Sequence, residues 1–205
     1  GMIRRKAAKA LHVVGLIGFP SMALMLVAGR QLGMLLYQNE KAGGHIPMLA
    51  AITLLGFYYA VAESVLESIG LQKRCSVLTV SASLVGLLST LLLGGVLGLG
   101  LKGYLLGELL SAGLGAALCL YWVCKKAELH IRLGNWVLRP LLASATAAAL
   151  TRLLLYRLYR TPAAQILVLA FSVGVFLLLY TSFLQLLGTD FWSYTQNTLL
   201  KKGEK

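Results

Sequence analysis

The sequence predicts an all-α membrane protein with about six transmembrane helices. Of the 205 residues, 58% are hydrophobic and 13% are charged, whereas about a quarter of the residues are charged in ordinary soluble domains. The apolar residues form long blocks, and about 20 apolar residues in a helix cross the hydrocarbon layer of a bilayer. These blocks are long for strands and lack the strict alternation of a barrel wall.

Six segments have the length of a membrane span. They are residues 11–29, 46–69, 75–99, 101–124, 136–156 and 163–187. We therefore expect a transmembrane region over residues 1–187 and a cytoplasmic tail over 188–205. Pro20 lies in the middle of the first segment, where its missing N–H predicts a kink. That kink would serve either packing or a hinge in a moving transporter.

The positive charges indicate how the chain is oriented. A net charge of +12 would suggest nucleic acid in a soluble chain, but the positions of the Lys and Arg residues give a better explanation. If the chain crosses the membrane six times, thirteen of the 19 Lys and Arg residues lie on one side of it: Arg4, Arg5, Lys6, Lys9, Lys73, Arg74, Lys125, Lys126, Arg132, Arg139, Lys201, Lys202 and Lys205. This excess marks the cytoplasmic side, so we expect both termini in the cytoplasm and no nucleic-acid partner.

Three acids lie within the predicted spans, where an ionisable group is costly and is by default a functional candidate. Glu63 and Glu67 are four residues apart and share one helix face, while Glu108 lies near the predicted outer end of its span. We expect Glu67 to reach the interface beside Lys73 or Arg74 and Glu63 to lie about one turn deeper. The three are candidate cleft or ion-coupling residues, with structural pairing as the alternative.

A row of small residues in segment 101–124 predicts a close helix contact. Gly103, Gly107, Ser111 and Gly115 recur at every fourth position, which lets another membrane helix approach closely. A helix-packing role is enough to explain this row of small residues.

No pattern in the chain indicates an enzyme, a metal site or a cofactor. The three histidines lie at span edges, and the three cysteines have no metal-ligand spacing. There is no Ser-His-Asp set or phosphate-binding loop at usable spacing.

Short motifs resemble one family of exporters. The stretch 26–37 ends in a Leu-Tyr pair after an apolar span, the segment 65–70 reads Val-Leu-Glu-Ser-Ile-Gly, and Gly100-Leu101-Lys102-Gly103 opens the next span. Together they resemble the stage V sporulation protein B family, polysaccharide-biosynthesis exporters of the multidrug/oligosaccharidyl-lipid/polysaccharide superfamily with a MATE-like fold. Glu67 departs from the Gln that is common in this family.

The resemblance implies that the chain is the C-terminal portion of a larger flippase. Family members have fourteen helices, and this chain resembles the last six, so the missing N-terminal helices would be its first partner. The implied place is the bacterial inner membrane, and the implied cargo is a lipid-linked oligosaccharide or similar amphiphile. The last two spans can border a groove for lipid tails; here the apolar candidates are Leu138, Leu141, Leu142, Leu167 and Phe171.

Three functions remain open at this point. The first is a flippase or exporter that moves a lipid-linked cell-wall or polysaccharide precursor by alternating access. The second is a non-transporting membrane scaffold that docks another helix bundle through the Gly103–Gly115 face. The third is a multidrug/cation antiporter of the same fold, for which Glu63 would be the coupling acid.

Overall fold

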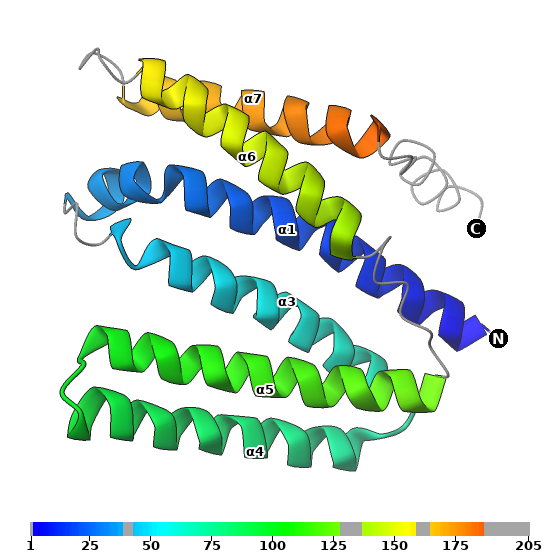
Figure 1. Ribbon diagram of the computed structural model, residues 1–205. Helices are drawn as coiled ribbons and strands as arrows, with labels where there is room; N and C mark the ends of the chain where they lie inside the picture. The colour runs from blue at the N-terminus through cyan, green and yellow to red at the C-terminus, as the bar shows by residue number, and fades with distance from the viewer. Residues whose placement is uncertain (1, 39–42, 128–136, 159–164, 187–205) are drawn as a thin grey trace.

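The protein is a bundle of long helices that run back and forth along one axis (Figure 1). A computed structural model describes residues 2–38, 43–127, 137–158 and 165–186. Its elements are α1 (Met2–Tyr37), α3 (Ile46–Ser68), α4 (Gln72–Thr90), the π-helix η1 (Leu91–Val96), α5 (Leu101–Ala127), α6 (Arg139–Leu158) and α7 (Gln165–Leu186). The expected tail, residues 188–205, lies outside the described residues.

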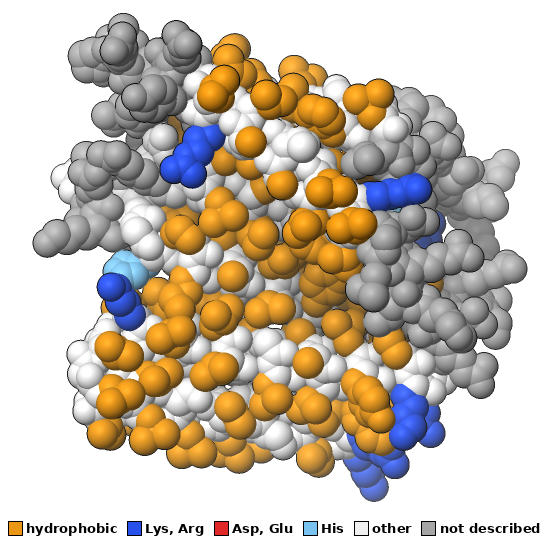
Figure 2. Space-filling view, in the orientation of Figure 1, with side chains coloured by type: hydrophobic (Ala, Val, Ile, Leu, Met, Phe, Trp, Pro, Cys, Tyr) orange, Lys and Arg blue, Asp and Glu red, His pale blue; other side chains and the backbone are white. Residues whose placement is uncertain are grey.

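Within the described residues, five helices are long and apolar enough to cross a membrane, which confirms the predicted class. These spans are Lys6–Gly29, Ile46–Ser68, Gln72–Val96, Leu101–Lys126 and Leu169–Leu186. The predicted span 136–156 forms α6 but is not among the five; Arg139 and Arg152 lie within it. Apolar side chains cover much of the face seen in Figure 2, and the Lys and Arg side chains in view lie toward the ends of the helices. The chain is therefore a multi-pass membrane protein.

Helix α1 is longer than the predicted span 11–29, because it begins at Met2 and continues to Tyr37. Pro20 lies inside this helix and is buried. A proline leaves the carbonyl four residues earlier without its helical N–H donor. That carbonyl, on Leu16, accepts a buried 2.8 Å hydrogen bond from the Tyr180 hydroxyl of α7. The backbone group that Pro20 frees is thus satisfied by a neighbouring helix, as membrane proteins require.

The buried side chains form two separate cores that share α1. In the first core, α1 packs with α3, α4 and α5; its buried members are Ala7, Leu11, Ala62, Leu66, Cys75, Cys119 and Val123. In the second core, α1 packs with α6 and α7; its buried members are Leu16, Ala23, Ala143, Ala147, Phe176, Tyr180 and Leu184. Helix α1 thus lies between α3 on one side and the α6–α7 pair on the other (Figure 1).

The row of small residues on α5 lies against α4. A methyl group added at Gly107 would lie 2.9 Å from the Thr90 backbone nitrogen, and one at Gly103 would lie 2.5 Å from the Gly94 nitrogen. The Ser111 hydroxyl donates a 3.0 Å hydrogen bond to the Ala82 carbonyl. These distances leave no room for larger side chains, so the row is the reason that α4 and α5 can pack this closely.

The last member of the row contacts a different helix. A methyl group at Gly115 would lie 3.1 to 3.2 Å from the ring carbons of Tyr59 on α3. Gly115 therefore provides the space in which the Tyr59 ring lies, one helical turn before Glu63.

Candidate functional site

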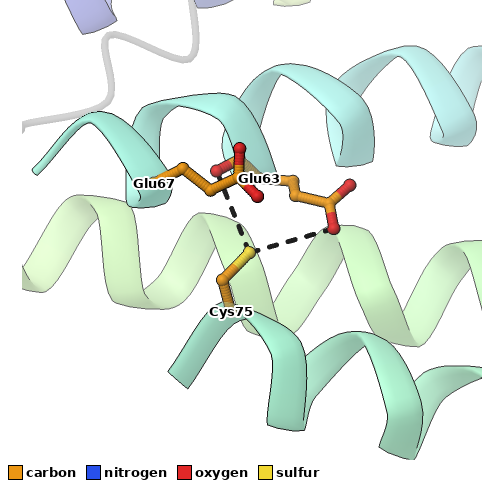
Figure 3. Close-up of side chains that lie close together, drawn as sticks. All are labelled: Glu63, Glu67 and Cys75. Atoms are coloured by element: carbon orange, nitrogen blue, oxygen red, sulfur yellow. Dashed lines mark hydrogen bonds between the residues drawn. The ribbon is translucent and has the colours of Figure 1, made fainter. Parts of the chain in front are cut away.

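A polar cluster lies between α3 and α4, inside the first core (Figure 3). We define the polar cluster as Glu63 and Glu67 of α3 with Cys75 and Thr79 of α4. The short turn between the helices, Ile69 to Leu71, includes Gly70 at φ 80° and brings the end of α3 beside the start of α4, while farther along α5 lies between the two helices (Figure 1). Because Glu63 and Glu67 are four apart on α3 and Cys75 and Thr79 are four apart on α4, both pairs present one helix face.

Hydrogen bonds join the members of the polar cluster. The Thr79 hydroxyl donates a 2.9 Å hydrogen bond to Glu63 Oε1. The Cys75 thiol lies 3.9 Å from the same oxygen and 3.9 Å from the Glu63 backbone carbonyl (Figure 3). One carboxylate oxygen of Glu63 is therefore the centre of the cluster, with two donors from α4 directed at it.

The two acids differ in their surroundings. Glu63 is half-buried and Glu67 is exposed, while Cys75 is buried with only 1% of its surface accessible. The expected pairing of Glu67 with Lys73 or Arg74 is not found, since within residues 43–127 neither acid forms an ion pair with either cation. Glu63 therefore keeps its position through a hydroxyl and a thiol rather than through a basic side chain.

Three side chains of the polar cluster have ligand atoms of a type and spacing that could suit a metal ion. One carboxylate oxygen each from Glu63 and Glu67 and the sulfur of Cys75 all lie within 4.8 Å of one another. Around a tetrahedral zinc ion with bonds of about 2.0 to 2.3 Å, ligand atoms are about 3.5 Å apart. The three groups would have to approach by up to about 1.3 Å, and the Thr79 hydroxyl already bonds to one Glu63 oxygen. The described geometry fits a carboxylate held by hydrogen bonds better than a preformed metal site.

The remaining candidates from the sequence lie away from the polar cluster. Glu108 is half-buried on α5, and no hydrogen bond or ion pair joins it to another residue in the part of the chain that the structure describes. Of the lipid-groove candidates, Leu138, Leu141, Leu142 and Phe171 are exposed, with Phe171 at 58%. The Leu167 side chain lies outside the described part of the structure.

Sequence reasoning missed Cys75 and Thr79 as partners of Glu63. Cys75 entered the sequence analysis only as one of three cysteines without metal-ligand spacing, and Thr79 was not singled out. The available signal was the matched spacing: two acids four apart before a short turn, and two donors four apart after it. In a helical hairpin, residues at similar distances from the turn lie opposite each other, so this spacing could have placed Thr79 beside Glu63.

The comparisons with known proteins add no family. No family model, curated protein or solved structure matches the chain. The class of protein that the fold defines is therefore a multi-pass helical membrane protein.

Proposed function

We propose that this chain is part of a membrane transporter, a flippase or exporter that moves a lipid-linked cell-wall or polysaccharide precursor across the cytoplasmic membrane. The lipid-linked cargo and the bacterial inner membrane follow from the motif resemblance. The transport reading rests on one observation, the setting of Glu63 in the polar cluster.

Glu63 lies in a membrane-crossing helix, where an acid with a purely structural role is expected to pair with a cation. Among the described residues its partners are instead the Thr79 hydroxyl and the Cys75 thiol. These neutral groups can donate to the ionised carboxylate and can also reorient when it takes up a proton. Such a setting suits an acid that changes its proton or ion during a transport cycle.

The helix arrangement is compatible with alternating access. The α6–α7 pair packs mainly on α1, whereas α3, α4 and α5 form a separate group on the other side of that helix. Two groups joined through one helix can change their relative angle with little repacking inside each group. The exposed side chains of Leu138, Leu142 and Phe171 on the α6–α7 pair leave an apolar surface for lipid tails.

Two other functions are weaker proposals. A scaffold that docks a partner through the small-residue row conflicts with the contacts of Gly103 and Gly107, because α4 and η1 already cover these positions. An antiporter of multidrug or cation type would use the same acid, Glu63, and differs from the flippase in its cargo and in its dependence on an ion gradient.

The test is lipid translocation by this chain reconstituted together with the helices that precede it in its parent transporter, since the proposal makes the chain one part of that protein. Proteoliposomes would contain a polyprenyl-phosphate-linked sugar with a fluorescent label on the sugar, and a membrane-impermeant reductant would be added outside. Without translocation about half of the label is bleached, because half faces the lumen. We expect the chain to bring the inner half into reach, and Glu63→Gln to slow this at least tenfold.

The matched control is Glu108→Gln, which removes an acid of similar burial outside the polar cluster and should translocate at the parent rate. If the complete assembly with the unsubstituted chain bleaches only half of the label, the flippase proposal fails. Equal rates for the parent and Glu63→Gln would remove the carboxylate from the mechanism. Cation flux driven by a proton gradient, without label translocation, would support the antiporter instead.

A further inference from the structure

Four cations lie at the end of the bundle where α4 begins and α5 ends. Lys73 and Arg74 belong to the first turn of α4, and Lys125 and Lys126 to the last turn of α5. All four are exposed, and within residues 43–127 none of them forms an ion pair with an acid. Figure 2 shows the basic side chains of this end beside an apolar surface that continues along α4 and α5. This concentration of unneutralised positive charge favours the binding of an anionic partner.

The side chain of Trp122 holds two of these cations in place. The Arg74 guanidinium lies 4.4 Å from the centre of the indole ring, and the Lys125 ammonium lies 5.5 Å from it. Lys125 is also 5.8 Å from the ring centre of Tyr121. A cation over an aromatic face is attracted by the ring quadrupole, so both long side chains are positioned before any ligand arrives.

The two positions are close enough to act on one anion. Both charges lie within 5.5 Å of the same ring centre, so their separation is at most about 10 Å, one Debye length at 0.1 M salt. At this distance the like charges repel each other in the free protein. A phosphate group near both would relieve that repulsion and accept hydrogen bonds from the guanidinium.

An apolar stripe on α4 begins one turn after Lys73. The stripe consists of Val77, Val80, Leu84, Leu87, Leu88 and Leu91, which are 53% to 64% exposed. Their spacing of three and four residues puts them on one helix face. Only 11% of the α4 span is buried inside the protein, against 39% of the α1 span, so this face is available to acyl chains.

A ligand that fits both features has a phosphate headgroup with a net negative charge and long apolar chains. We propose that Arg74, Lys125 and the Trp122 indole form a binding site for an anionic phospholipid of the surrounding bilayer, whose acyl chains lie along the α4 stripe. Clusters of basic residues at the ends of membrane helices attract anionic lipids at about 1 kcal/mol per cation, or about fivefold. The site is independent of the transport proposal, since it shares no residue with the polar cluster.

Trp122 can report on this site directly. The chain has three tryptophans, and replacing Trp136 and Trp192 with Phe leaves Trp122 as the only one. This reporter chain would be reconstituted into mixed bilayers in which either the phosphatidylglycerol or the phosphatidylcholine carries bromine atoms in its acyl chains. We expect brominated phosphatidylglycerol to quench Trp122 as if it were enriched at least fivefold over its bulk fraction, and brominated phosphatidylcholine to be depleted.

The variant Arg74→Gln/Lys125→Gln should make quenching by the two lipids equal. The matched control, Lys6→Gln/Lys102→Gln, removes the same net charge from two other exposed positions and should keep the preference. Arg74→Lys, which keeps the charge, should retain most of it, and circular dichroism would verify the helical fold of each variant.

Three results would overturn the proposal. One is equal quenching by both brominated lipids in the reporter chain, and another is a preference that survives the loss of Arg74 and Lys125. The third is abolition of the preference by millimolar inorganic phosphate, because the site would then be one for free phosphate rather than for a bilayer lipid.

Discussion

The two buried cores differ in the kind of group that joins their helices. In the core of α1, α3, α4 and α5, helices meet at glycines and at a half-buried acid with its donors. In the core of α1, α6 and α7, the buried side chains are mainly apolar, and Tyr180 joins α7 to α1 by a hydrogen bond to the Leu16 carbonyl. Phe176 and Tyr180 stack there with ring centres 6.3 Å apart.

This difference indicates a division of roles within one bundle. Ionisable groups inside a membrane cost free energy and are kept where they serve a purpose, and here the half-buried acid of the polar cluster packs with the first core. The second core resembles an anchor, since the buried hydroxyls of Ser144, Ser172 and Tyr180 all bond to backbone carbonyls. The α6–α7 pair would then hold α1 in place while the α3–α4 hairpin carries the chemistry.

The largest expected loss of stability comes from a substitution at a glycine contact of the first core. In Gly107→Ala the new methyl group would clash with Thr90 and would lie 3.1 Å from the Gly86 carbonyl oxygen. Overpacking of this kind costs about 1 to 3 kcal/mol. We expect a loss of about 3 kcal/mol in the free energy of unfolding, measured by denaturant titration in mixed micelles.

The matched control for Gly107 is Gly174 in α7, where an added methyl group meets nothing within 4 Å. Gly174→Ala should leave stability unchanged or raise it by up to about 1 kcal/mol, because alanine is the better helix former. If the two substitutions have equal effects, the contrast in packing between the cores is wrong.

The sequence predicts the glycine row and its spacing, because small residues at every fourth position have one physical use in a membrane helix. It does not predict which helix fills the row, since α4 and α3 both contact it and the choice depends on how the helices are arranged in space. Glu63 could be named as a candidate from its place in a span, whereas the spacing across the turn was the one signal for its donors. The bond from Tyr180 to Leu16 joins residues 164 apart, a distance over which local patterns carry no information.

Tyr180→Phe tests the second core and the role of Pro20, and we expect an intermediate loss of stability. The substitution keeps the ring stack with Phe176 but removes the donor to the Leu16 carbonyl, which Pro20 has left without its helical partner. Hydrogen bonds between membrane helices contribute about 0.6 kcal/mol on average and up to about 1.7. We expect a loss near 1.5 kcal/mol by the same titration, because the carbonyl is buried and has lost one donor already.

The double variant Pro20→Ala/Tyr180→Phe tests whether the tyrosine hydroxyl serves the carbonyl that Pro20 frees. Alanine at position 20 restores the helical N–H, so the Leu16 carbonyl no longer needs the tyrosine. If the hydroxyl serves that carbonyl, Tyr180→Phe lowers the free energy of unfolding in this background by at least 1 kcal/mol less than it does in the parent chain. A cost that is unchanged by the proline substitution would mean that the hydroxyl serves some purpose other than satisfying that carbonyl.

The smallest effect on stability is expected for Thr79→Val, which keeps the shape of the side chain and removes the hydroxyl that donates to Glu63. The carboxylate is half-buried and can turn toward water at the end of α3, so the cost should be about 0.6 kcal/mol, the average for such bonds. If the first core carries the chemistry, the same substitution should slow lipid translocation severalfold, because Glu63 then loses its closest donor.

Thr181→Val is the matched control: this hydroxyl on α7 bonds only to carbonyls of its own helix, at 2.9 and 3.0 Å, and its loss should change neither quantity by more than the error. A Thr79 variant that loses stability but keeps its translocation rate would place the hydroxyl among the structural contacts, and the division of roles between the two cores would then rest on Glu63 alone.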